Sequence, residues 1–296
     1  MRPGWNMQGR NFTRKILYRT ITNVHMTGYQ LRTPNHIPTY SHTHIHLVLA
    51  LTMLVVSEAS AGKTPRGLND AELLTRVREC IAARLQLCAK KLDQTPDDHE
   101  WRFELLRAHH RNAAAGNGDS VRQAARLLAT LAEEASEDQR ITAYRGSLKL
   151  IEAKRAFWFW DKASLAKQGV KLLDRAVQLD PQDITVRAIR GISTSHLPDS
   201  FKRQDQSLAD LAWAVDRIDD GLAKKRIDPA MATAILQQYG VSLFRSGQKT
   251  AAAEAWRRAT VIGPKTVGGI KAAHMLRENI DEDGNEELSM PEAPAK

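Results

Sequence analysis

The residues with the greatest capacity for chemistry in this sequence are histidines, two cysteines and a run of aromatic side chains. Four of the histidines lie near the N-terminus, at His36, His42, His44 and His46. Imidazole is a common metal ligand, so the His-x-His-x-His spacing could collect an ion. No carboxylate or thiol lies nearby, however, and the cluster runs directly into an apolar segment. We therefore expect no metal site.

Motifs for nucleotide binding or nucleophilic catalysis do not occur. Gly62-Lys63-Thr64 lacks the upstream glycine of a phosphate-binding loop, and no Gly-x-Ser-x-Gly is present. His109 and His110 are adjacent on a predicted helix and point about 100° apart, which favours a solvated helix end over a shared ligand site. Cys80 and Cys88 lie about 12 Å apart along one predicted helix, too far for a disulfide, whose Cα atoms lie within ~7 Å. They are either buried thiols or partners in an intermolecular bridge. We expect no enzymatic activity and no cofactor.

Phe157-Trp158-Phe159-Trp160 is the most concentrated apolar feature outside the N-terminal region. On a helix, four consecutive aromatic residues would point in all directions. Such a stretch must bury both faces in the core or leave one face for a partner. The candidate binding residues here are Arg155, Trp158 and Trp160, with an aromatic ligand pocket as the sharper alternative to core packing.

The positive charge of the chain is concentrated at its N-terminus. The sequence has 43 basic and 34 acidic residues and a formal net charge of +9. Residues 1–61 hold six of the basic residues and one acid, Glu58, leaving 37 basic and 33 acidic residues in the rest. The remaining 235 residues therefore carry a net charge of only +4. We expect no nucleic-acid partner.

Residues 1–61 have the layout of an export segment. The apolar run Ile45–Val56 follows basic residues and precedes the small-residue site Ala59-Ser60-Ala61. This order is typical of a secretory signal cleaved after Ala61, and the run is short of the ~20 residues of a membrane span. We expect export, to the periplasm, with membrane contact only if this segment stays uncleaved as an anchor. The alternatives are an organellar transit peptide, a cytoplasmic protein, and a true start at a later methionine such as Met26.

From Thr64 onward the apolar residues recur every three or four positions, which predicts an all-α body. Capping boxes at Asn69–Glu72 and Ser136–Gln139 predict helix starts, as do Asp97 or Asp98 and Asp119. The helix that begins near Ser136 is expected to continue into the aromatic run. The tail, residues 280–296, is rich in acidic residues, proline and glycine, and is predicted to be disordered.

The stretch Thr233–Thr266 has the residue pattern of a closely packed helical hairpin. It has Leu236 and Tyr239-Gly240 in a first helix, and Gly247 at the turn. Its second helix has Ala252, Trp256 and Ala259, and Pro264 stands at its end. With this pattern the chain resembles the tetratricopeptide (TPR) family over about residues 69–279. Leu148–Pro181 and Ile184–Ile218 are degenerate repeats, the second with an inserted loop, and Trp101–Ser136 is a hairpin with a widened turn. The resemblance implies a right-handed α-solenoid of antiparallel helical hairpins over residues 62–279.

The resemblance also implies a function and a surface. TPR arrays usually bind protein or peptide along first-helix positions, here Ala188, Ile192, His196, Gln237, Val241, Phe244 and Arg245. The carboxylate-clamp version expects lysine and asparagine where Gln237 and Val241 stand, so capture of a chaperone C-terminus is not expected. Arg187, Arg190 and Arg245 favour an acidic peptide or small anion. We expect a non-catalytic scaffold. The alternative is a small-molecule-binding component of a transport system, since the periplasmic T-components of TRAP transporters have similar helices.

Overall fold

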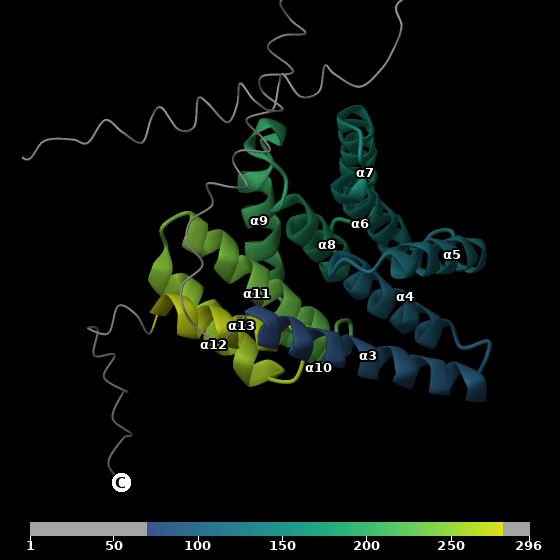
Figure 1. The fold of residues 1–296 in the computed structure, drawn as a ribbon, viewed down its shortest axis with the longest axis horizontal. Helices are drawn as coiled ribbons and strands as arrows, with labels where there is room; N and C mark the ends of the chain where they lie inside the picture. Colours follow the sequence, from purple (N-terminus) through teal and green to yellow (C-terminus); the bar gives the residue numbers. More distant parts are fainter. Residues whose placement is uncertain (1–69, 281–296) are drawn as a thin grey trace, which may run out of the picture. The chain divides into compact units, whose positions relative to one another are not determined.

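The structure is a computed structural model that describes residues 70–280. The segments whose apolar residues recur every three or four positions form consecutive helices in it. These residues form eleven α-helices and one 3-10 turn, and no strand occurs among them (Figure 1). The helices are α3 (Asp70–Gln94), α4 (His99–Ala114), α5 (Gly118–Glu134), α6 (Gln139–Arg155), α7 (Phe159–Leu179), α8 (Ile184–Thr194), α9 (Gln204–Val215), α10 (Ile218–Ala223), α11 (Pro229–Arg245), α12 (Lys249–Ile262) and α13 (Val267–Ile280). The all-α prediction is confirmed.

Some predicted features fall outside the described residues. These are the export segment 1–61 with its histidines, the domain start at residue 62, the cap Asn69, and the acidic tail from residue 281 onward. Ile280, which the sequence assigned to the tail, is the last residue of α13.

Acidic and amide side chains cap five of the eleven described helices. Asp98 caps α4 by accepting a hydrogen bond from the Trp101 backbone NH at 3.0 Å, as predicted. Two other predicted starts are wrong by two residues each. Asn117, not Asp119, caps α5, because its amide oxygen accepts from the Ser120 NH. Asp138, not Ser136, caps α6.

The helices pack as consecutive antiparallel pairs, α4 with α5, α6 with α7, α8 with α9, and α11 with α12 (Figure 1). The first helices of the pairs also contact one another, α6 with α4 and α8, and α8 with α11. Buried side chains such as Leu131, Leu173, Leu211 and Trp256 join the pairs in one continuous core. The described residues therefore form one compact unit.

The α11–α12 hairpin has the geometry that the sequence predicted for Thr233–Thr266. Gly247 makes the turn with a φ of 84°, a conformation that glycine adopts readily. The indole of Trp256 lies against Gly240 so closely that no side chain would fit there. The Trp256 Nε1 donates to the Gln237 carbonyl at 3.1 Å. The hairpin extends further than the repeat, because α11 begins at Pro229 and is capped by Asp228.

The α6–α7 hairpin differs from the prediction. A single helix was expected to run through the aromatic residues, but α6 ends at Arg155 and α7 begins at Phe159. The two helices approach closely where Gly146 faces Gly169. A Cβ added to Gly146 would lie 2.9 Å from the Gly169 carbonyl oxygen. These two glycines therefore let α6 and α7 approach closely, as Gly240 and Trp256 do for α11 and α12.

The two remaining hairpins show one confirmation and one correction. The inserted loop predicted between α8 and α9 is present and contains the 3-10 turn Asp199–Phe201. The turn between α4 and α5 is not widened. It comprises residues 115–117, as short as the turn at residues 246–248, with Gly116 at a φ of 101°.

The first described helix meets the last one. α3 packs against α4 and also against α13. The Cys80 thiol of α3 donates to the Lys265 carbonyl at 3.3 Å. Cys80 is half-buried, Cys88 is fully buried, and both thiols are free. Burial raises the pKa of both, which favours the buried-thiol prediction over an intermolecular bridge.

Candidate binding surfaces

The four aromatic residues between α6 and α7 lie at the surface. We call Phe157–Trp160 the aromatic tip. Phe157 is 85% exposed, Trp158 53%, Trp160 52% and Phe159 37%. The expectation that these rings pack in the core is wrong, because the helix break at residues 156–158 turns them outward. The other alternative, a face left for a partner, agrees with these exposures.

The rings of the aromatic tip are ordered against one another. Trp158 and Trp160 stack with centroids 4.9 Å apart and an interplanar angle of 9°. Phe157 meets Trp158 edge to face at 5.0 Å, and Phe159 meets Trp160 similarly at 4.7 Å. The rings thus contact one another while their outer surfaces face solvent, which is an open arrangement unlike an enclosed small-molecule pocket.

Arg155 fixes the base of the aromatic tip. Its Nη1 donates to the Gly116 carbonyl at 2.7 Å, which joins the end of α6 to the α4–α5 turn. Its guanidinium also lies against Gly118. The structure therefore gives this predicted binding residue a positioning contact within the chain.

Arg187 and Arg190 are engaged by carboxylates of the same chain. Arg190 makes a two-point ion pair with the buried Asp210, with N–O distances of 2.6 and 2.9 Å. It also reaches Asp174 at 3.3 Å. Arg187 stacks over the Trp213 ring at 4.5 Å and lies 3.7 Å from Asp210. These two predicted anion-binding arginines help to hold α7, α8 and α9 together, and both already have carboxylate partners within the chain.

The predicted groove positions on α11 divide into packed and exposed residues. Phe244 lies against the ring of Trp256, with centroids 5.8 Å apart. Gln237 and Val241 are partly buried, and Val241 packs on the core. On α8, Ala188 is fully buried and Ile192 packs on the core. Arg245 is exposed, and its Nη1 donates to the Ser195 carbonyl at 3.3 Å.

Arg245 belongs to a group of cations that the sequence alone did not bring together. We call Lys154, His196, Arg245 and Lys271 the cationic cluster. All four are exposed, and none makes an ion pair with a carboxylate among residues 70–280. They come from the end of α6, the end of α8, the end of α11 and the middle of α13. Lys154 and Lys271 were missed because they lie far apart in the sequence, on α6 and α13, and interact only in the folded chain.

The cationic cluster carries positive charge that is not paired with any carboxylate of residues 70–280. The pKa of His196 is lowered to about 4, first because surrounding protein atoms desolvate the imidazole and then because Arg245, Lys271 and Lys154 repel its protonated form. Desolvation by neighbouring atoms also lowers the pKa of Lys271, and repulsion from Lys154 adds to the effect. His196 is therefore neutral at pH 7, and an anion bound here would relieve the repulsion among the three remaining cations.

His109 and His110 are not a solvated helix end as predicted. Both are partly buried. His109 Nδ1 lies 3.2 Å from the Ser120 hydroxyl, and His110 Nε2 lies 2.9 Å from the Ser147 hydroxyl. Burial lowers the pKa of His110 to about 4, with a smaller contribution from Arg111. These imidazoles act as hydrogen-bonding parts of the packing between α4, α5 and α6.

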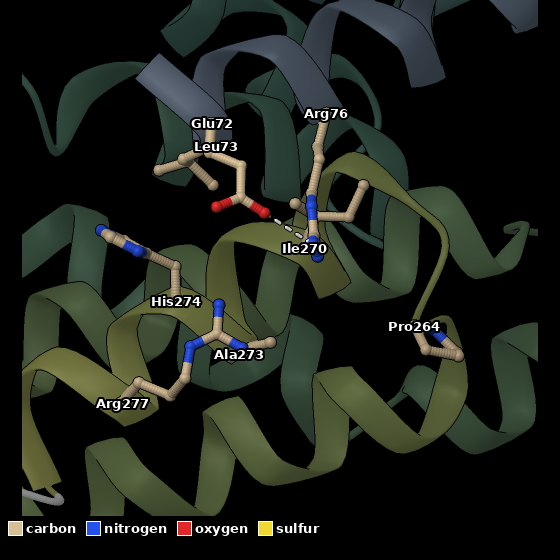
Figure 2. A pocket seen from close by; sticks show the side chains of 8 residues that line it. All are labelled: Glu72, Leu73, Arg76, Pro264, Ile270, Ala273, His274 and Arg277. Carbon is tan, nitrogen blue, oxygen red and sulfur yellow. Dashed lines mark ion pairs between the residues drawn. The ribbon is translucent and has the colours of Figure 1, made fainter. Parts of the chain in front are cut away.

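A small pocket lies where α3 meets α13 (Figure 2). Glu72, Leu73 and Arg76 of α3 face His274 and Arg277 of α13, and Glu72 pairs with Arg76 at 2.6 Å. Its volume is about 80 Å³, well below the ~300–1,000 Å³ of small-molecule sites. We interpret it as a seam between the two helices.

The described residues hold neither a cluster of metal ligands nor a membrane-spanning helix. No group of three or more histidine, cysteine, aspartate or glutamate side chains in residues 70–280 is placed to hold a metal ion. No helix in this described part is both long and apolar enough to cross a bilayer.

Comparison with known proteins yields one similar fold. No protein-family model matches the sequence, and no curated protein sequence matches it. A thermophilic TPR protein from Thermus thermophilus has a crystal structure that aligns with 69% of this chain and 99% of its own, at 16% sequence identity and a TM-score of 0.47. The TPR-like character described here rests on the hairpin packing itself, above all on α11–α12.

Proposed function

We propose that this protein is a non-catalytic TPR-like scaffold that binds an acidic segment of a protein or peptide partner at the cationic cluster. The observation that carries the proposal is the gathering of Lys154, Arg245 and Lys271 with His196, without a carboxylate partner among the described residues. Like charges held together cost electrostatic energy, and an acidic ligand relieves that cost. The proposal refines the sequence hypothesis, because Arg187 and Arg190 already have a carboxylate partner in Asp210.

The placement of the cluster supports a peptide-sized ligand. Three of its members lie at or just beyond the C-terminal ends of the first helices α6, α8 and α11. The fourth lies on α13, which packs on α11 and α12. An extended acidic segment running past these elements would meet the cations Lys154, Arg245 and Lys271 and the neutral imidazole of His196, so several weak contacts add up along a chain.

A labelled hexaglutamate peptide provides the test, with binding followed by fluorescence anisotropy at low and moderate salt. We expect weak, salt-sensitive binding and a loss of about tenfold or more in Arg245→Glu/Lys271→Glu, since each 1.4 kcal/mol of lost attraction is tenfold. Arg126→Glu/Arg257→Glu is the matched control, because it makes the same charge change at exposed positions of the second helices α5 and α12. Equal losses in both variants would reduce the effect to net charge and contradict the proposal.

We further propose that the scaffold acts after export. The support is the apolar run Ile45–Val56 followed by Ala59-Ser60-Ala61. N-terminal sequencing of the mature protein should give a start at Gly62. A start well before Gly62, in protein recovered from the cytosol, would contradict export and leave the peptide proposal standing.

A further inference from the structure

We propose that the aromatic tip, Phe157–Trp160, anchors this protein to the surface of an anionic membrane by inserting its rings among the lipid headgroups. The inference concerns the connection between α6 and α7, which shares only Lys154 with the cationic cluster, and it does not depend on the proposed function.

The first argument is the concentration of exposed apolar surface. Eight large hydrophobic side chains are exposed in the described part of the chain. Four of them are the consecutive residues of the aromatic tip, while the others, Leu74, Leu87, Leu179 and Val261, are scattered over α3, α7 and α12. Scattered exposed residues are ordinary, but a continuous exposed patch marks a contact with something apolar.

The second argument is the type of residue that surrounds the rings. Lys154 and Lys162 flank the tip in the sequence and are exposed, as are Lys167 and Lys171 further along α7, and Asp161 is the single acid of residues 153–173. Lysine is depleted at protein–protein interfaces. Lysine next to tryptophan is instead characteristic of membrane surfaces, where the ammonium groups meet lipid phosphates and the indoles lie at headgroup level. This composition favours a bilayer over a protein partner or a second copy of the chain.

The third argument is geometry. The tip is the connection between two long helices that pack extensively on each other, so its rings are carried on a rigid base. Arg155 ties this base to the α4–α5 turn through Gly116, and the stacked pair Trp158–Trp160 is already in place. Preorganised rings lose little conformational entropy on insertion. Since no described helix can span a bilayer, the contact of this region would be interfacial.

Vesicle flotation with the full chain tests the inference. The vesicles are phosphatidylcholine alone or phosphatidylcholine with phosphatidylglycerol. We expect binding to the anionic vesicles and a loss of about tenfold or more in Trp158→Ala/Trp160→Ala, because both indoles leave the interface. Leu179→Ser/Val261→Ser is the control, since it removes two exposed apolar side chains away from the tip and should bind as the parent does.

A second readout identifies the inserted residues. Brominated phosphatidylcholine, added to the anionic vesicles, quenches tryptophans that reach the bilayer. We expect strong quenching in the parent and much weaker quenching in Trp158→Phe/Trp160→Phe, which keeps the rings and should retain most of the vesicle binding.

Three outcomes would overturn the inference. Unchanged vesicle binding in Trp158→Ala/Trp160→Ala would assign any binding to another region, such as residues 45–56. Loss of vesicle binding in Arg245→Glu/Lys271→Glu, with no loss in Trp158→Ala/Trp160→Ala, would assign the vesicle binding to the cationic cluster. Absence of parent binding, with self-association that Trp158→Ala/Trp160→Ala abolishes, would make the tip an interface between copies.

Discussion

The α11–α12 and α6–α7 hairpins both pack closely at glycine residues, but the first buries its large aromatic ring and the second exposes its aromatic rings. Both bring two helices together at glycine, at Gly240 in one and at Gly146 with Gly169 in the other. In α11–α12 the large ring fills the resulting space, and Trp256 is fully buried. In α6–α7 the glycine backbones fill the space themselves, and the four aromatic rings stand at the surface beyond the end of α6.

The difference separates aromatic residues that stabilise the fold from those available for contact. Burying an aromatic side chain removes ~150–250 Å² of surface from water, so a chain that leaves four together outside forgoes much stabilisation. The exposed rings lie in the hairpin that departs from the TPR pattern, and the buried ring lies in the hairpin that follows it. Departure from the repeat is therefore the better guide to where a partner makes contact.

The largest expected effect comes from removing the buried ring. Trp256→Ala should lower the free energy of unfolding by about 3–5 kcal/mol, because it leaves a cavity against Gly240. Chemical denaturation monitored by circular dichroism measures the change. A loss below about 1 kcal/mol would mean that Trp256 is not the central packing element of its hairpin.

The second effect concerns acid and lies in the half of the molecule that contains α4 and α6. His110 has a pKa of about 4 in the fold against about 6.5 when unfolded. The unfolded chain therefore binds the proton more readily, and stability is fully present above pH 6.5 and falls as the pH drops towards 4. Each unit corresponds to 1.36 kcal/mol, so the loss attributable to this group is up to about 3 kcal/mol.

The measurement for His110 is the unfolding free energy of the parent and of His110→Gln between pH 7 and pH 4. The variant removes the titrating group, so the difference between the two proteins should narrow as the pH falls. Other groups titrate equally in both and cancel in this comparison. A constant difference across the range would show that His110 keeps an ordinary pKa.

Adding a methyl group between α6 and α7 should have a smaller effect. Gly146→Ala places a Cβ within 2.9 Å of the Gly169 carbonyl and the Leu173 side chain. Crowding of this kind costs about 1–3 kcal/mol, and the better helix propensity of alanine returns up to about 1 kcal/mol. We expect a net loss of about 1–2 kcal/mol in denaturant unfolding. An unchanged or higher stability would show that the helices can separate slightly without cost.

The smallest expected effect completes the comparison. Trp158→Ala should change the free energy of unfolding by no more than about 0.5 kcal/mol, as is usual for exposed positions. Parallel denaturation curves of this variant and of Trp256→Ala give the contrast directly. If Trp158→Ala destabilised the fold by several kcal/mol, the aromatic tip would be a structural element, and its assignment as a contact surface would fail.

The sequence predicts the regular hairpin well because its signals are local. Gly240, Gly247 and Trp256 stand at fixed spacings, and each has a geometric role that follows from its size. The break before α7 is not predictable in this way. Neither glycine nor proline interrupts residues 148–168, and Trp158 stands at the helix start without a capping hydrogen bond from its side chain. The close approach of α6 and α7 at Gly146 and Gly169 is a tertiary contact that the local sequence around the break does not indicate.

The candidate site was less predictable than the fold because charge balance is a tertiary property. Arg190 and Arg245 look equivalent in the sequence, and both lie on first helices. Asp210 neutralises the first from the neighbouring helix α9, while the second is surrounded by other cations. Lys271 lies far along the chain from Lys154, so no local pattern indicates that they interact.

The contact between α3 and α13 affects how the protein unfolds. Repeat proteins usually behave as one-dimensional stacks whose ends fray first, because terminal repeats have a neighbour on one side only. Here the first and last helices of the described residues contact each other, so fraying of one exposes the other. We expect hydrogen exchange in α3 and α13 to be nearly as slow as in the central hairpins, and the chain to unfold as one cooperative unit.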